Sequence, residues 1–164
     1  MSVLAVWLRA TAYALWAPPL AVGPVASRLR VPRRLLGESI IPRDRLTVRA
    51  VWHSVLGGAL GVLTWFLAFL AVLAAVRGIF YPLLNDHYEN SWGGPTLAGA
   101  WTVHALLGVG LLPAWLLLLA ALGVLQVRLT RALLGRAGPR WPVPAAVLLC
   151  AGGVLLFVAW LHQL

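Results

Sequence analysis

Long stretches without a charged side chain divide this sequence and predict helices that cross a membrane. Residues 50–76 hold no charged side chain, and as a helix they would be about 40 Å long, which exceeds the roughly 30 Å hydrocarbon core of a bilayer. A second span is predicted over 97–127, after a Gly-Gly-Pro breaker and with a kink at Pro113. Residues 143–164 are also long enough to cross once.

The N-terminal stretch is apolar but interrupted. Between Arg9 and Arg28 lie 18 uncharged residues, and Pro18 and Pro19 fall among them. Because proline breaks a helix, this stretch is either a kinked span over 3–26 or an interfacial helix with a short re-entrant turn. We favour the span. The predicted fold is therefore an all-α integral membrane bundle of about four transmembrane helices, forming a single domain.

The composition agrees with a membrane location. Hydrophobic residues make up 62% of the chain and charged residues 10%, against about 25% charged residues in soluble domains. A soluble core of this size could not bury so much apolar surface, so the lipid bilayer is the expected environment. Cys150 is the only cysteine, which excludes an intramolecular disulfide and a thiolate metal site.

The basic residues indicate how the chain lies in the membrane. All thirteen are Arg, and the formal net charge is +9. Eleven lie in two Arg-rich loops, 27–49 and 128–142, whereas the 77–96 loop holds one. The positive-inside rule places both Arg-rich loops in the cytoplasm and the 77–96 loop outside a multi-pass cell-membrane protein. This rule accounts for the charge, so we expect no nucleic-acid binding.

Between about residue 45 and residue 135 the chain carries a series of structural motifs. They are Trp52 at the start of a long helix, Tyr81-Pro82-Leu83-Leu84, Trp92-Gly93-Gly94, Trp101, Pro113-Ala114-Trp115, and an Arg-x-Leu-Leu-Gly exit at 131–135. In this order they resemble the membrane-embedded sensor domain of actinobacterial two-component histidine kinases. The resemblance covers about 90 of the 164 residues and implies a helical module for signal transduction.

The chain departs from that family after Gly135. Where the family continues into a cytoplasmic dimerisation helix and an ATP-binding domain, this chain has Pro139, Trp141 and another membrane segment. The resemblance therefore implies a sensor-like module without its kinase region. Any signal would have to pass to a separate protein partner, such as a histidine kinase or another membrane complex.

The 77–96 loop contains the residues that we expect to contact a signal. They are Tyr81, Asp86, His87, Tyr88, Glu89 and Trp92. Asp86, His87 and Glu89 are of types that bind divalent metal ions, but three ligands so close in sequence rarely complete a site. A solvated turn is the favoured interpretation of the acidic cluster, and metal binding stays an alternative.

Small residues form a face on the predicted helix 50–76. They are Ser54, Gly57, Gly58 and Gly61, and Gly108 has the same role in the next span. Small residues let helix backbones approach closely in lipid. They predict packing within the bundle, with a homodimer through 50–76 as the alternative.

No pattern of catalytic residues stands out in the sequence. We find no nucleophile paired with a base, no paired carboxylates and no phosphate-binding loop, so we expect neither an enzyme nor a bound cofactor. His53 and His104 should lie near opposite faces of the membrane, roughly 15 Å or more apart, too far to share a haem iron.

The predicted function is a sensor-like module. The alternatives are an accessory or anchoring subunit of a transporter or enzyme complex and, less favoured, a haem-binding redox subunit.

Overall fold

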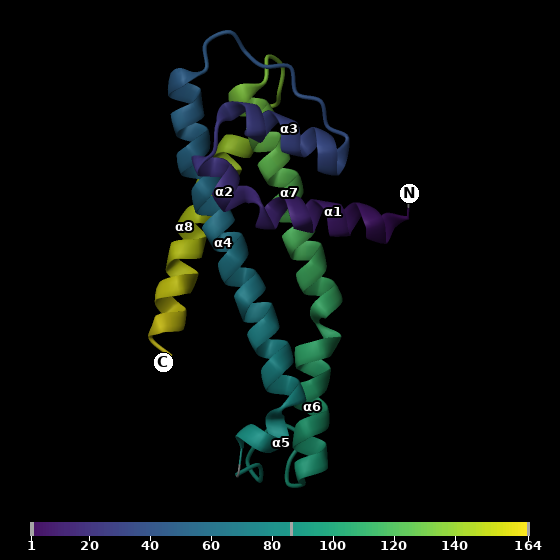
Figure 1. Cartoon of the computed structure of the whole chain (residues 1–164). Coiled ribbons are helices and arrows are strands. Elements are labelled where there is room, and N and C mark those ends of the chain that lie inside the picture. The colour runs from purple at the N-terminus through teal and green to yellow at the C-terminus, as the bar shows by residue number, and fades with distance from the viewer. Residues whose placement is uncertain (1, 86, 164) are drawn as a thin grey trace. The chain divides into compact units, whose positions relative to one another are not determined.

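A computed structural model describes residues 2–85 and 87–163 as an all-helical chain (Figure 1). The helices are α1 (Val3–Leu15), α2 (Ala17–Val22), α3 (Val25–Leu36), α4 (Thr47–Ile79), α5 (Tyr81–Leu84), α6 (Leu97–Gly110), α7 (Leu112–Leu134) and α8 (Pro142–Leu161). The all-α class predicted from the sequence is confirmed. Parts of the predicted loops are helical: α3 lies within the first Arg-rich loop for most of its length, and α7 extends into the second.

Three stretches of helix are long and apolar enough to cross a membrane. They are Thr47–Ile79, Leu97–Leu134 and Pro142–Leu161, and each overlaps a predicted span. The second consists of α6 and α7, which are separated at Leu111, two residues before Pro113. Proline has no N–H to donate and its ring crowds the preceding turn. The interruption at Leu111 is therefore where a kink caused by Pro113 is expected.

The N-terminal stretch does not form one continuous helix. The chain leaves helix α1 at Trp16, just before Pro18 and Pro19, and α3 starts only after Gly23-Pro24. With 13 residues, α1 is about 20 Å long, too short to cross a bilayer on its own. Figure 1 shows α1 running across α7 rather than alongside it. This arrangement favours the interfacial alternative over the single kinked span that we preferred for 3–26.

The described helices fall into two compact units. Unit 1 contains the chain up to Trp65 and from Leu119 onwards, and unit 2 contains Phe66–Leu118. Both α4 and α7 continue from one unit into the other.

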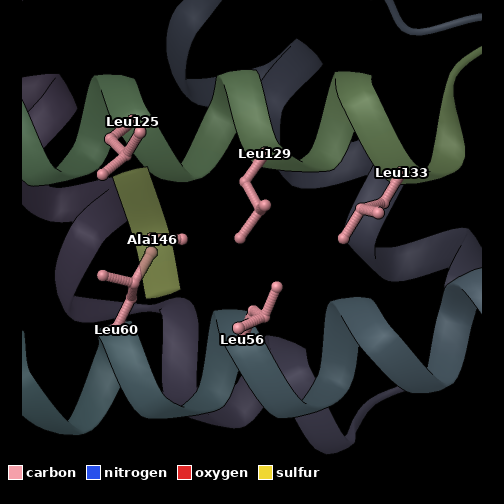
Figure 2. Packing of buried hydrophobic residues seen from close by; sticks show 6 residues of the cluster. All are labelled: Leu56, Leu60, Leu125, Leu129, Leu133 and Ala146. Carbon is pink, nitrogen blue, oxygen red and sulfur yellow. The ribbon is translucent and has the colours of Figure 1, made fainter. Parts of the chain in front are cut away.

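The core of unit 1 is a stripe of leucines between α4 and α7 (Figure 2). Its buried members are Leu56, Leu60, Leu125, Leu129, Leu133 and Ala146. The leucines recur every four residues on each helix, which places them on one face. Leu60, Leu129 and Ala146 are completely buried, and the small side chain of Ala146 brings α8 against the same core.

Close backbone approaches hold the N-terminal helices onto this core. A Cβ atom on Gly123 of α7 would collide with the carbonyl oxygen of Ala10, so α1 crosses α7 at a point where only glycine fits. A Cβ on Gly61 of α4 would lie 2.7 Å from the Pro18 ring, and one on Gly58 would lie 3.4 Å from the Cβ of Ala21. The small face predicted on this helix thus receives α2.

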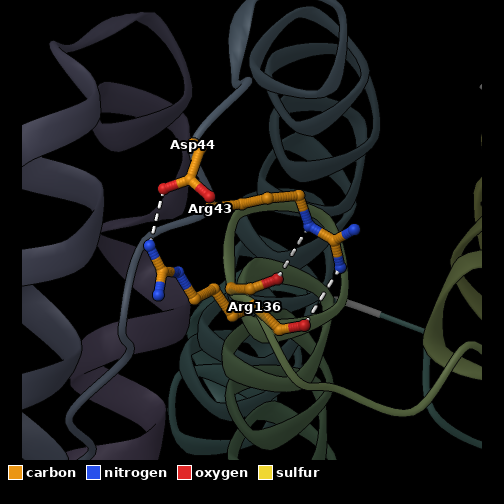
Figure 3. Close-up of polar contacts among 4 residues, drawn as sticks. Arg43, Asp44 and Arg136 are labelled. Carbon is orange, nitrogen blue, oxygen red and sulfur yellow. Dashed lines mark hydrogen bonds and ion pairs between the residues drawn. The ribbon is translucent and has the colours of Figure 1, made fainter.

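Hydrogen bonds join the two Arg-rich loops of unit 1 into one basic surface (Figure 3). Arg43 donates from Nε to the carbonyl of Gly135 and from NH2 to the carbonyl of Arg136, both at 3.2 Å. Arg136 donates in turn to the carboxylate of Asp44 at 2.6 Å. Residues more than 90 positions apart in sequence are therefore fixed together.

Unit 2 is a pair of helices closed by the 77–96 loop. A Cβ on Gly108 would collide with the carbonyl oxygen of Ala74, so α6 packs closely against the end of α4 there. Short α5 packs on α6. Trp101 donates from its indole nitrogen to the carbonyl of Ile79 at 3.1 Å, which ties the start of α6 to the end of α4.

The packing around α4 predicts that two of its glycines differ in their tolerance of a methyl group. Gly61→Ala should lower the free energy of unfolding by about 1–3 kcal/mol, because the rigid Pro18 ring must move. Gly57→Ala is the matched control: its Cβ would lie 3.5 Å from the His53 ring, an ordinary contact, and alanine favours helix by up to about 1 kcal/mol. Denaturant titration in mixed micelles measures both, and equal stabilities would contradict the α2–α4 packing.

Candidate functional site

A cluster of polar side chains lies buried inside unit 1. Its members are Tyr13 of α1, Arg28 of α3, His53 and Thr64 of α4, and Gln126 and Thr130 of α7. Each is at most 7% exposed. Four helices therefore contribute to one polar cluster, which we call the Thr130 centre. Polar groups buried in apolar surroundings are costly unless they are hydrogen-bonded, so their pairing defines the site.

The hydroxyl of Thr130 uses all its hydrogen-bonding capacity. It donates its one hydrogen to the carbonyl of Gln126, one turn earlier, at 2.9 Å. Its oxygen must then accept from the two other partners, Nε2 of His53 at 2.9 Å and the hydroxyl of Tyr13 at 3.3 Å. The geometry thus makes Tyr13 a donor and places a hydrogen on Nε2 of His53.

The other ring nitrogen of His53 faces a cation. Arg28 reaches Nδ1 from NH1 at 3.4 Å, and since arginine only donates, Nδ1 is an acceptor. His53 is therefore the neutral Nε2–H tautomer, because a second ring hydrogen would point at the guanidinium. Arg28 also donates to the carbonyls of Gly23 and Ala50, each at 3.0 Å. Burial lowers the pKa of Arg28 from its usual value, but an arginine side chain stays charged.

Gln126 and Thr64 extend the centre along the α4–α7 interface. The amide nitrogen of Gln126 donates to the hydroxyl of Thr64 at 3.4 Å, and Thr64 donates to the carbonyl of Leu60 at 2.8 Å. The other amide atom, Oε1 of Gln126, is buried and accepts no hydrogen bond within the described chain. This oxygen of Gln126 can therefore still accept a hydrogen bond.

The Thr130 centre cross-links the helices of unit 1. It contains one cation, one neutral imidazole, three hydroxyls and one amide, and none of these six groups is a carboxylate. One series of hydrogen bonds runs from Arg28 through His53 to Thr130 and the main-chain carbonyl of Gln126. The side-chain amide of Gln126 makes a separate bond to Thr64. A shift of α4 against α7 would break two of them together, His53–Thr130 and Gln126–Thr64.

Sequence reasoning found only part of this centre. It singled out His53 but counted Arg28 as a loop charge, whereas α3 buries that side chain to 7% exposure. Gln126 and Thr130 were missed because they carry no charge. Their spacing of four residues within an apolar helix was the available signal, since such residues share a helix face.

The signal-contacting residues predicted in the 77–96 loop do not form one cluster. Tyr81 is buried, donates to the hydroxyl of Ser91 at 2.7 Å, and stacks on His104 with 4.0 Å between the ring centroids. His87, Glu89 and Trp92 are exposed and Tyr88 is half-buried. Asp86 lies outside the described residues. Among the described residues, no three His, Cys, Asp or Glu side chains come together as a metal site.

The remaining predicted residues have distinct surroundings. Gly57 lies beside the imidazole of His53, at a distance that would also accommodate a Cβ atom, while Ser54 is half-buried. His104 binds the carbonyl of Ala100 through Nδ1 at 2.8 Å. Both nitrogens of His53 are engaged in the Thr130 centre, so binding a haem iron there would require breaking that centre.

Comparison with protein families, with curated proteins and with solved structures finds no match to this chain. The likeness to kinase sensor domains therefore stays a prediction that rests on the motifs.

The Thr130 centre predicts unequal effects of the same substitution at two threonines. Thr130→Val should lower the free energy of unfolding by about 1–2 kcal/mol, because the buried donors of His53 and Tyr13 lose their acceptor. Thr102→Val is the control: Thr102 is exposed and donates to the carbonyl of Ala98 one turn earlier, so the loss of this bond should cost less than about 0.5 kcal/mol. Denaturant titration in micelles compares the two.

A double-mutant cycle separates the hydrogen bond from other effects of the substitution. Tyr13→Phe removes only a hydroxyl, and its cost should shrink in the Thr130→Val background because the two groups contact each other. Strictly additive costs would mean that the two side chains do not interact.

Proposed function

We propose that this chain is a sensor-like integral membrane module that passes a membrane or extracellular signal to a partner protein and has no catalytic output of its own. The observation that carries this proposal is the Thr130 centre, a buried polar junction of four helices within otherwise apolar surroundings. Polar groups kept inside membrane helices are a functional hypothesis by default, since apolar residues would pack there at lower cost.

The hydrogen bonds of the centre are well suited to a switch. Each is directional, and two of them, His53–Thr130 and Gln126–Thr64, join α4 to α7, so a small rotation of one helix against the other would break both. Switching elements in proteins are of this kind, with two discrete packings rather than a continuous range. Arg28 links the centre to the start of α4 through the carbonyl of Ala50, next to the Arg-rich loops.

The joined Arg-rich loops are the surface that we propose for the partner. Arg43, Asp44 and Arg136 lock the loops together, so a change in the helices that enter them would move them as one body. In the proposed topology both loops are cytoplasmic and the 77–96 loop is outside, where the exposed side chains of His87 and Trp92 would face the signal.

This topology predicts where single cysteines can be labelled. In a Cys150→Ser background, Asn90→Cys should react with a membrane-impermeant maleimide on intact cells, and Arg45→Cys and Arg140→Cys should react only after permeabilisation. All three positions are exposed, so a lack of reaction cannot come from burial. Ser2→Cys distinguishes the two alternatives for the N-terminal stretch, because it is outside if 3–26 crosses and inside if that stretch is interfacial. Labelling of Arg45→Cys on intact cells would contradict the topology.

One observation favours a second candidate, an accessory or anchoring subunit of a larger membrane complex. In α8 only 6% of the membrane-spanning window is buried inside the chain. A helix so little covered by its own chain presents its apolar surface to lipid or to another protein. In this alternative α8 would be the contact with the complex.

A tagged pull-down from native membranes in mild detergent separates these two candidates. Under the sensor proposal a histidine kinase or its regulator should be recovered, and replacing His87 and Glu89 together by Ala should change the signalling output but not the recovery. The matched control replaces Asn85 and Asn90 instead.

Stoichiometric recovery of transporter or enzyme subunits without any signalling protein would contradict the sensor proposal. In that case α8 should be tested as the contact, with Leu148→Trp and Leu155→Trp on its exposed surface.

A further inference from the structure

A cavity in unit 1 lies where α1, the end of α3 and α7 meet. Its volume is about 430 Å³, within the range of roughly 300–1,000 Å³ that is usual for ligand sites. One part of its wall is apolar and includes Val6, Val124 and Val127, while Arg128, Arg131 and Glu38 form the polar part. The cavity therefore combines an apolar wall with a basic one.

The charges around this cavity favour an anion. Arg131 pairs with Glu38, which neutralises one of the two guanidinium groups and leaves Arg128 in excess. The surrounding unit is strongly basic, because unit 1 holds twelve of the thirteen Arg and only two of the four acidic residues. An arginine has five donors in a planar fork, a geometry that matches a phosphate group.

The position of Arg128 is that of a residue at the membrane surface. Its guanidinium lies over the ring of Trp141, 5.5 Å from the centroid. Trp141 immediately precedes α8, and Arg128 lies in the last two turns of α7. Tryptophan is enriched at the level of the lipid headgroups, so both helix ends belong at that depth. The apolar wall of the cavity then lies on the hydrocarbon side.

We propose that this cavity binds one anionic phospholipid, with the phosphate at Arg128 and Arg131 and an acyl chain against Val6, Val124 and Val127. Basic pockets between membrane helices bind anionic lipid headgroups in this way. A free phosphate would leave the apolar wall uncovered, and a zwitterionic lipid would bring its own cation to an already basic site. The proposal goes beyond the sensor function and does not depend on it.

The test uses the delipidated full chain in mild detergent, with phosphatidylglycerol and phosphatidylcholine of equal chain length as probes and native mass spectrometry to count the bound lipid. Phosphatidylglycerol should bind about tenfold more tightly than phosphatidylcholine, because both carry a phosphate but only phosphatidylcholine brings a cation beside the arginines. Arg128→Gln should remove most of that difference. Arg45→Gln is the matched control, with the same loss of charge at an exposed position that does not line the cavity.

A second variant tests the apolar wall without changing any charge. Val124 is 43% exposed, so Val124→Trp should fold and fill part of the cavity, which would weaken binding of both lipids. Leu148→Trp on exposed α8 is its control. This variant also keeps the proposal testable if Arg128→Gln does not fold.

Three results would overturn the proposal. They are equal binding of the two lipids by the unchanged chain, equal phosphatidylglycerol binding by Arg128→Gln and Arg45→Gln, and full displacement of phosphatidylglycerol by inorganic phosphate. The last result would identify a phosphate site in place of a lipid site.

Discussion

The organisation of unit 1 depends on the hydroxyl of Thr130. It has one hydrogen and two lone pairs, and α7, α4 and α1 each use one of them. Acceptance from His53 fixes the tautomer of that ring, and the tautomer in turn gives Arg28 an acceptor. These groups are buried, and a buried polar group that loses its partner is costly, so the positions of α1, α4 and α7 depend on the same small set of bonds.

The membrane-spanning stretches were predictable because lipid imposes a requirement that a sequence shows directly. A run such as 50–76 must be long and uncharged to cross, and α4 occurs there. The N-terminal stretch is also apolar, but it does not form one continuous helix. Its prolines interrupt it, and its path depends on α1 crossing α7 at Gly123. This contact joins residues far apart in sequence, so no local pattern shows it.

The Thr130 centre was less predictable than the fold for a different reason. A search for charge finds groups whose burial is costly, but an uncharged Gln126 or Thr130 changes the apolar character of a helix only slightly. His53 was noticed, yet its partners Arg28 and Thr130 come from two other helices, α3 and α7. The misassignment of Arg28 has the same origin, since only the packing of α3 shows that this charge is buried and paired with carbonyls.

A uniform set of arginines therefore has several physical roles in this chain. Arg28 is buried and holds helix ends together through backbone carbonyls, whereas Arg43 and Arg136 join two loops into one surface. Arg128 lies over an indole at the edge of a half-apolar cavity. The positive-inside rule treats all of them as equal charges and bears only on the proposed side of the membrane. Their separate contacts explain why replacing one arginine by a neutral residue should disturb stability, loop geometry or lipid binding, depending on which one is replaced.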